Sequence, residues 1–281
     1  MLRLTWPPGR PKTAGVRARA GVKVDLVEFD QYVLSGDEKR NAVELVPGWN
    51  HRLPPEAGVE IGSGSLYDDF RVTWAIEQFG GVSGRSVLEI GPMEASHTYM
   101  LERAGACVHA VEANKLAFLK CLVAKEILGL KARFSLAEIN EWLRASSATY
   151  DLIFACGVLY HMRDPVTLLE LLAQRTCAIF LWTHFATEEE IRLADAARAP
   201  HLRREKRLGQ TIRLVRRPYH GSAERPGFCG GVFDEPSWMP KQDLLDVLMA
   251  LGFDDVRIAF EQLDHPYGPA LSVFARKTSS P

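Results

Sequence analysis

Residues 86–100 read SVLEIGPMEASHTYM, an apolar run that leads into a glycine turn and then into a segment of helical character. A buried strand, a glycine turn and a helix, in this order, form the usual binding element for nucleotide-like cofactors. Such turns carry two or three glycines, whereas this one has only Gly91 and continues as PMEA. A stretch richer in glycine, VEIGSGS at 59–65, is a rival for the same role.

The surroundings of the two turns distinguish them. The rival's apolar run is only three residues long, and no acid-terminated strand follows it at a suitable distance. The other copy has Glu89 near the end of its strand, and the next apolar run, CVHAVE, ends in Glu112, 21 residues after Gly91. An acid at that position can accept hydrogen bonds from a ribose diol. The sequence therefore predicts that the turn at Gly91, and not the rival, binds a cofactor.

Short apolar runs alternate with amphipathic helical patterns from residue 67 to residue 185. This alternation implies right-handed crossovers and a parallel sheet with helices on both faces. A last helix (241–253) precedes two strand-like runs (255–262 and 270–277) without a helix between them, which predicts an antiparallel hairpin at the sheet edge. The fold class is therefore α/β, with a doubly wound, mostly parallel sheet. Earlier strand-like runs lie at 86–90, 107–112, 132–137, 150–157 and 178–185.

Two segments depart from this alternation. Residues 1–64 are rich in proline, and we expect an N-terminal extension that wraps on the core rather than a separate domain. The main domain then spans 65–281 and contains an insertion at 186–239, where folds of this kind commonly build a substrate lid. We expect irregular structure from 198 to 238. Between 198 and 225 this lid has nine Lys or Arg residues against two acids.

Composition limits the class of protein. The 281 residues include 47% hydrophobic and 25% charged residues, with a formal net charge of −1, as in an ordinary soluble globular protein. Nothing in this charge favours a nucleic-acid or membrane surface. The five cysteines are odd in number and form no CxxC pair, which favours reduced thiols and a cytoplasmic location. No apolar run reaches the roughly 18 residues of a membrane helix, and the basic N-terminus lacks a signal-peptide core.

Three stretches together resemble the class I S-adenosylmethionine-dependent methyltransferases: VLEIGPMEASHT at 87–98, VHAVEAN at 108–114 and YDLIFACGVLYHMRDPVTLL at 150–169. The resemblance covers about residues 68–185, and the elements at 240–277 match the family's closing elements. GVLYHMRDP is similar to a subgroup that includes the tRNA wobble-uridine carboxymethyl-transferring enzymes. The resemblance implies a Rossmann-like fold with a seven-stranded sheet, and S-adenosylmethionine as the cofactor.

The cofactor turn departs from the family's pattern. The first strand of the family usually ends as acid-x-Gly-x-Gly-x-Gly, so Met93 and Ala95 replace the second and third glycine. Because only glycine visits positive φ freely, Met93 needs a negative φ or a strained backbone. We expect a reshaped turn that still binds. The predicted cofactor-binding residues are Arg71, Glu89, Gly91, Pro92, Met93, Glu94, Ala95, Glu112, Ala113, Asn114, Ala137, Glu138, Cys156 and Gly157.

Several of these side chains have more than one possible role. Glu112 would hold the ribose hydroxyls, since a buried acid needs partners. Glu89 would accept a hydrogen bond from the cofactor's amino group or organise the turn. Asn114 and Glu138 could instead cap helices. Arg71 could bind the cofactor's carboxylate or form an ordinary salt bridge.

Tyr160 and His161 follow the fourth strand, and the resemblance places them near the methyl group or the acceptor as candidate catalytic residues. Histidine titrates near neutrality and could take a proton from an attacking hydroxyl or amine. Methyl transfer from a sulfonium needs chiefly alignment, so a packing role for the pair stays open. The eight histidines show no metal-ligand spacing, and no metal is predicted.

These observations predict an S-adenosylmethionine-dependent methyltransferase that acts on an oxygen, nitrogen or carbon atom of a small-molecule acceptor. The alternative enzyme modifies an RNA base, such as one of tRNA, by methyl or carboxymethyl transfer through the basic segment 198–225. A degenerate cofactor-binding scaffold, in which Met93 blocks the site, is the alternative without catalysis. No membrane partner is expected, and the oligomeric state is left open.

Overall fold

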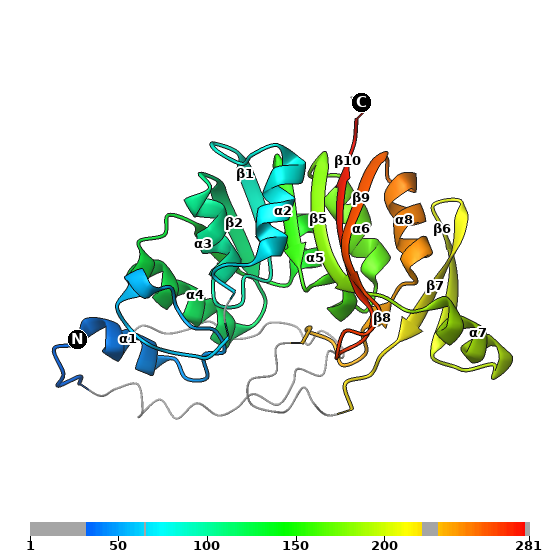
Figure 1. Cartoon of the computed structure of the whole chain (residues 1–281). Coiled ribbons are helices and arrows are strands. Elements are labelled where there is room, and N and C mark those ends of the chain that lie inside the picture. Colours follow the sequence, from blue (N-terminus) through cyan, green and yellow to red (C-terminus); the bar gives the residue numbers. More distant parts are fainter. Residues whose placement is uncertain (1–31, 65, 221–229, 279–281) are drawn as a thin grey trace, which may run out of the picture. The chain divides into compact units, whose positions relative to one another are not determined.

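The centre of the protein is a seven-stranded sheet. The computed structural model describes residues 32–64, 66–220 and 230–278, and the chain divides into two units after Gly36. The unit that begins at Asp37 contains the sheet, whose strand order is β3-β2-β1-β4-β5-β10-β9 (Figure 1). The strands are β1 Ser86–Ile90, β2 Cys107–Glu112, β3 Arg133–Leu136, β4 Leu152–Cys156, β5 Ala178–His184, β9 Asp255–Gln262 and β10 Ala270–Arg276.

The pairing confirms the doubly wound, mostly parallel sheet. Strands β1 to β5 pair in parallel, and β10 is antiparallel to both of its neighbours, β5 and β9. The predicted hairpin closes the sheet, with β10 inserted between β5 and the edge strand β9. The strand order reverses between β1 and β4. In open α/β sheets, ligands bind beyond the carboxyl ends of the strands at such a reversal.

Helices cover both faces of the sheet, which explains why the central strands are apolar on both sides. On one face, Leu143, Leu169 and Val247 belong to a core cluster with strand residues such as Ile153. On the other face, the aromatic rings of β4 and β5 stack, with Phe154 and Phe180 centroids 4.7 Å apart. The helices are α2 Phe70–Phe79, α3 Ser96–Arg103, α4 Lys115–Leu128, α5 Ile139–Ala145, α6 Pro165–Ala173 and α8 Lys241–Ala250.

The segment from Asp37 to Gly64 packs against α4. It contains α1, Glu38–Leu45, and a 3-10 helix, η2, Pro55–Ala57. Val43 and Leu53 are buried in one cluster with Cys121 and Ala124 of α4. The glycine-rich stretch at 59–64, the other candidate for the cofactor turn, forms no strand. Its Gly64 pairs with His51 in an isolated β-bridge. The sequence prediction that this stretch is not the cofactor turn agrees with its irregular backbone.

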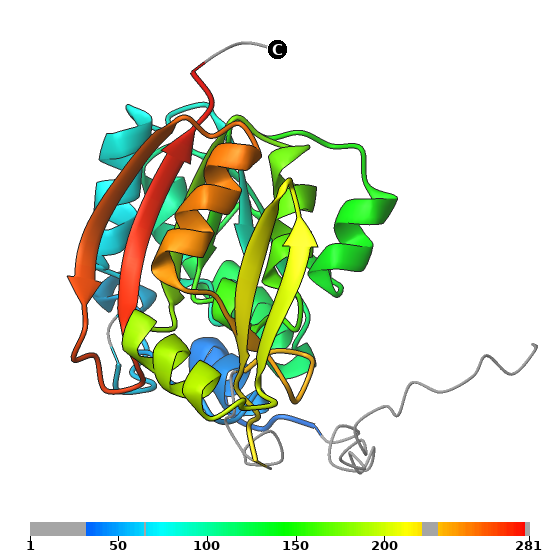
Figure 2. The ribbon, with the colours of Figure 1, turned by 90° about the vertical axis from the view of Figure 1, so that its right-hand side faces the viewer.

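The insertion at 186–239 forms a small antiparallel sheet. It contains α7 Glu188–Ala196, β6 Leu202–Arg207, β7 Gln210–Arg216 and β8 Ser237–Trp238, in the order β6-β7-β8. Figure 2 shows the β6–β7 ribbon (yellow) beside α8 (orange). The expectation of irregular structure was wrong for β6 and β7. Their turn, Leu208-Gly209, has φ of 53° and 74°, and leucine at a position that favours asparagine concealed the hairpin from the sequence.

Most basic side chains of the insertion are neutralised by carboxylates. The Arg213 guanidinium, for example, lies 2.5 Å from Asp243 of α8 and 2.7 Å from Glu188 of α7. The other described pairs are Arg192–Glu189, Arg203–Glu205, Arg204–Asp195, Arg207–Asp164, Arg207–Glu170, Arg207–Glu205, Arg216–Glu235 and Arg217–Glu190. Arg225 lies outside the described residues. The positive charges of this basic segment are therefore mostly paired with carboxylates of the same chain.

Within the part of the chain that the structure describes, no helix has the length and apolar character needed to cross a membrane.

Candidate functional site

The turn after β1 and the end of β2 are joined by one carboxylate. Glu112 accepts a hydrogen bond from the Met93 amide at 3.1 Å through Oε2 and from the Asn114 amide at 2.8 Å through Oε1. The Gly91 amide donates to the Val111 carbonyl at 2.9 Å, so the turn leaves β1 directly beside β2. The two predicted halves of the cofactor site, turn and acid, therefore lie together at the carboxyl edge of the sheet.

The backbone of the turn is left-handed at every position where the family carries glycine. Gly91, Met93 and Ala95 have φ of 70°, 56° and 62°. A left-handed residue other than glycine costs about 1–2 kcal/mol. The sequence left two possibilities for Met93, a negative φ or a strained backbone. The structure shows the strained backbone. A Cβ atom added to Gly91 would lie 3.0 Å from Val158 Cγ2, so the turn runs close against the loop after β4.

Glu94 directs its carboxylate at the N-terminal segment. It accepts hydrogen bonds from the Asn50 and His51 amides at 2.9 and 2.8 Å, and it forms a buried ion pair with Lys120 at 2.8 Å. Burial alone would raise the pKa of Glu94, but the hydrogen bonds from His51 and Lys120 outweigh it and lower the pKa to about 2. The carboxylate thus fastens residues 50–51 to the turn, and a cofactor would meet the backbone of Glu94 rather than its side chain.

Glu89 is an acid buried beneath the turn. Its side chain is 1% exposed and accepts a hydrogen bond from the Thr98 hydroxyl, while its Oε1 atom has no hydrogen-bond partner among the described residues. Burial raises the pKa of Glu89 to about 8, against the effect of Thr98. Such an orphan oxygen needs a polar partner. A group with an amino or hydroxyl hydrogen over the turn would fit the residues present.

Glu112 is the second buried acid of the site and is 8% exposed. Burial raises its pKa, although the amides of Asn114, Met93 and Ala113 act in the opposite direction. Each carboxylate oxygen has a further lone pair beyond the one that its amide uses. The side chain can therefore hold the turn and still accept two hydroxyl hydrogens, as a ribose diol requires.

Three other predicted cofactor contacts have structural duties. The Asn114 side chain caps α4 by accepting from the Leu116 and Ala117 amides, and the Glu138 side chain caps α5 by accepting from the Glu141 amide. The Ala137 amide donates to the Glu112 carbonyl at 2.8 Å. For Asn114 and Glu138, the structure shows the helix-capping alternative.

Arg71 belongs to a buried polar cluster that the sequence did not indicate. Its guanidinium binds Asp69 with two contacts of 2.6 and 3.0 Å, and Asp69 also bonds His97 Nε2 at 2.9 Å. The hydrogen bonds from His97 and Arg71 overcome the burial of Asp69 and hold its pKa well below the usual range. The Arg71 guanidinium also lies 4.7 Å from the ring centroid of Trp182. The salt-bridge alternative is thus present, at the edge of the candidate site.

Tyr160 and His161 lie in a one-turn 3-10 helix, η3, Leu159–His161. Their ring centroids are 4.0 Å apart, and His161 Nδ1 bonds the Tyr219 hydroxyl of the insertion at 2.5 Å. Burial, followed by the neighbouring His184, lowers the pKa of His161 to about 4. The imidazole of His161 is therefore neutral at pH 7 and is a weak base.

Cys156 and Gly157 connect β4 to this loop. Burial raises the pKa of the Cys156 thiol to about 12, so the thiol stays protonated and is not a nucleophile. The Gly157 amide donates to the Trp182 carbonyl at 2.9 Å, and Gly157 has φ of 84°. A Cβ atom at Gly157 would lie 3.8 Å from the Tyr160 hydroxyl and 3.9 Å from Trp182. The strand end therefore meets the aromatic side chains of the loop and of β5.

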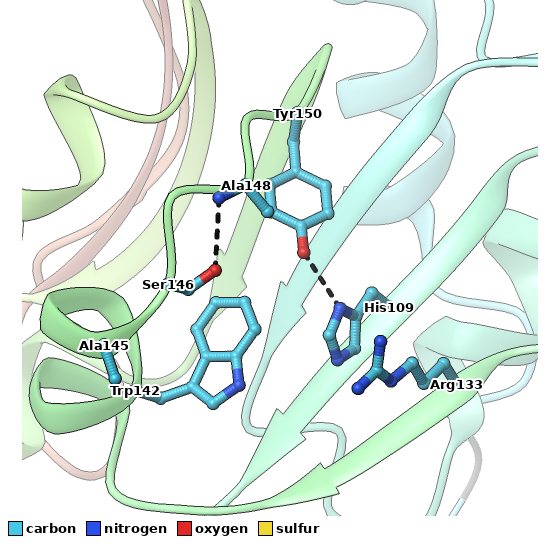
Figure 3. A pocket seen from close by; sticks show the side chains of 7 residues that line it. All are labelled: His109, Arg133, Trp142, Ala145, Ser146, Ala148 and Tyr150. Carbon is cyan, nitrogen blue, oxygen red and sulfur yellow. Dashed lines mark hydrogen bonds between the residues drawn. The ribbon is translucent and has the colours of Figure 1, made fainter.

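A recess between β2, β3 and α5 lies at a different place. Figure 3 shows His109, Arg133, Trp142 and Tyr150 around it, with His109 bonded to the Tyr150 hydroxyl. Arg133 begins β3 and Tyr150 precedes β4, so this recess is near the amino ends of those strands. It is separate from the carboxyl edge that carries Glu112.

The strand order, the inserted antiparallel strand and the turn joined to Glu112 define the fold of the class I S-adenosylmethionine-dependent methyltransferases. Comparisons with solved structures agree. The N-terminal domain of EvdMO1, crystallised in the presence of SAH and D-fucose, matches with a TM-score of 0.65 and 22% identity over 90% of this chain and 97% of that chain. The resemblance that the sequence suggested is confirmed at the level of the fold.

Curated relatives are also methyltransferases. A tRNA U34 carboxymethyltransferase of Photobacterium profundum is 21% identical over 57% of this chain. A ubiquinone biosynthesis O-methyltransferase of Bordetella avium is 24% identical over 62% of this chain. The aligned region covers 49% of the first relative and 66% of the second. No family model matches the chain.

We predict that Ala95→Gly is neutral or stabilises the protein by up to about 1 kcal/mol, because relief of a left-handed strain of about 1–2 kcal/mol exceeds the loss of a methyl group of about 0.8 kcal/mol. Ala124→Gly in α4 is the matched control, since Ala95 and Ala124 are both fully buried. The control should lose about 1 kcal/mol or more. Urea unfolding measures both changes, and equal destabilisation by the two substitutions would contradict a strained turn.

We predict that Glu89→Gln makes the protein relatively more stable as pH rises. The pKa of Glu89 is raised from 4.5 to about 8, so the folded state binds a proton that the unfolded state has released, and wild-type stability falls between these values. The variant should gain up to about 1.4 kcal/mol per pH unit over wild type in this range. Urea unfolding from pH 5 to pH 8 tests the prediction. Parallel stability curves would show that Glu89 is ionised when folded.

Proposed function

We propose that this protein is an S-adenosylmethionine-dependent methyltransferase that binds the cofactor between the turn after β1 and Glu112. The observation that supports this most is the left-handed backbone at Gly91, Met93 and Ala95, held by the hydrogen bond from the Met93 amide to Glu112. The turn keeps the conformation of a glycine-rich cofactor turn although two of its glycines are absent. The backbone of Met93 is therefore compatible with a binding turn.

The chain's own residues supply complementary contacts. Glu112 offers free lone pairs to a ribose diol, and the unpartnered Oε1 of Glu89 offers an acceptor or, when protonated, a donor beneath the turn. Gly91 permits close approach of the backbone to a ligand. S-adenosylmethionine supplies a methyl group on a positively charged sulfur, and the protein's task is to align an acceptor with that methyl group. Tyr160 and His161 follow Val158, the residue of the loop after β4 that approaches the turn at Gly91.

For the acceptor, we favour a small molecule. The basic residues of the insertion are mostly paired with its own acids or with those of α6 and α8, which leaves little unpaired positive charge for a phosphate backbone. The relatives described above include an O-methyltransferase of ubiquinone biosynthesis. The loop after β4 and the end of β5 present aromatic rings, which suit an uncharged acceptor.

A tRNA acceptor is the second candidate, because several curated relatives are tRNA U34 carboxymethyltransferases. Arg198 and Lys206 of the insertion form no ion pair with a described residue and could meet phosphates. Under this alternative, unfractionated tRNA would bind with steep salt dependence, and Arg198→Glu with Lys206→Glu would weaken binding. Binding that is absent or insensitive to these changes leaves the small-molecule acceptor.

We predict that Glu112→Gln weakens S-adenosylmethionine binding about 10- to 100-fold in calorimetry. A hydrogen bond to a charged group contributes about 1.5–3 kcal/mol, and each 1.4 kcal/mol is a factor of ten in affinity. The glutamine oxygen can still accept from one backbone amide, so the variant should fold. Glu126→Gln, on the exposed side of α4, is the control for lost charge. Unchanged affinity in Glu112→Gln, or no binding by wild type, would refute the proposed function.

A further inference from the structure

His184, the last residue of β5, is held in one tautomer by the backbone. Its Nδ1 lies 2.9 Å from the Gly268 carbonyl oxygen and 3.3 Å from that of Pro269, in the connection between β9 and β10. A carbonyl oxygen can only accept a hydrogen bond, so Nδ1 carries the hydrogen. In the neutral ring, Nε2 then carries the lone pair. Nε2 has no hydrogen-bond partner among the described residues.

Aromatic side chains from four segments surround this imidazole. Its ring centroid is 4.5 Å from Tyr160 of the loop after β4, 5.1 Å from Trp182 of β5 and 4.9 Å from His265 of the β9–β10 connection. Trp238 of the insertion stacks on it at 5.1 Å, with 12° between the planes. The cluster adjoins Gly157, since a Cβ atom there would meet Tyr160 and Trp182. Thus the strand ends, the insertion and the hairpin meet at His184.

The neighbouring His161 is less suited to take a proton from a ligand. Its Nδ1 contacts the Tyr219 hydroxyl, which can donate or accept a hydrogen bond, so this contact does not fix the tautomer that leaves a lone pair on Nε2. A Cβ atom at Gly231 would lie 2.4 Å from the His161 carbonyl oxygen, so the insertion packs directly on this residue. His184, in contrast, is oriented through the far side of its ring, which resembles the way that a hydrogen bond at one nitrogen orients a general base.

We propose that His184 is the acceptor-side base of the methyl transfer, and that the acceptor is an uncharged ring compound that carries a hydroxyl group. This inference rests on the proposed function. The acceptor oxygen would form the bond to the methyl carbon while the methyl–sulfur bond breaks and leaves its electron pair on sulfur. The hydroxyl proton would pass to Nε2, so the positive charge of the sulfonium ends on the imidazolium.

The chemistry of the cluster selects this class of acceptor. A neutral amine is already nucleophilic, whereas a hydroxyl oxygen gains most from a base that takes its proton. The rings of Tyr160, Trp182 and Trp238 offer apolar faces to a flat or ring-shaped ligand. Among the described residues, no carboxylate forms a hydrogen bond or an ion pair with His184. The titratable groups that face it are His161, His265 and Tyr160, and Arg217 lies 4.6 Å over the Trp238 ring.

The test uses the full chain with phenol and methyl α-D-glucopyranoside as probes, one for planar and one for sugar hydroxyls. In spectra of protein with ¹⁵N-labelled histidine, His184 should show hydrogen on Nδ1. At least one probe, added with S-adenosylhomocysteine, should shift the His184 Nε2 resonance saturably, and Trp238→Ala should weaken that shift. An Nε2–H tautomer, or no shift with either probe, overturns the proposal.

Turnover is then measured with any probe or ring-hydroxyl compound that yields S-adenosylhomocysteine. His184→Asn retains a donor near the Gly268 carbonyl but lacks the base, and it should lower kcat about 100-fold or more with little change in KM for S-adenosylmethionine. His109→Asn, in the separate recess beside Tyr150, is the matched control and should change kcat little. Equal effects, or an unchanged kcat in His184→Asn, overturn the proposal. Calorimetry with S-adenosylmethionine distinguishes failure of the His184 proposal from failure of the proposed function. If wild type does not bind S-adenosylmethionine, the proposed function itself is refuted.

Discussion

The hydrogen bond from the Met93 amide to the Glu112 carboxylate is the contact on which the arrangement of the site depends. It joins the turn after β1 to the end of β2 at 3.1 Å and fixes a backbone that Met93 and Ala95 would not adopt by preference. Strained residues persist where their surroundings over-determine them, and they cluster at functional sites. Here the fixed neighbours are the β2 acid on one side and the loop after β4 on the other.

The N-terminal segment reinforces this turn from outside the sheet. Glu94 anchors the Asn50 and His51 amides and pairs with Lys120 of α4. These contacts leave the carboxylate fully partnered in a buried position, where an unpaired charge would be costly. The segment before β1 is consequently part of the support of the site, and a residue predicted from the family pattern to meet a cofactor serves to hold the turn in place.

The sequence was sufficient for the main sheet because its central strands are apolar on both faces and several helices have caps and glycine stops. The sequence pattern also predicted the position of Glu112 at the end of β2, 21 residues after Gly91. The sign of φ at Met93 did not, because tertiary contacts decide it. Trp182 and His184 were missed as well, since alternate residues of an apolar strand resemble ordinary core until the hairpin carbonyls orient the imidazole. The β6–β7 hairpin was hidden by a leucine in its turn.

The insertion and the hairpin explain why the proposed acceptor side could not be predicted from the family pattern. Trp238 comes from the insertion and Gly268 from the β9–β10 connection, and both converge on His184. These segments are far apart in the sequence and have no fixed spacing from the cofactor turn. The proposed cofactor side depends on local order along β1 and β2, whereas the proposed acceptor side depends on contacts among loops. In this fold, variation of the loops can therefore change the acceptor while the turn and Glu112 stay in place.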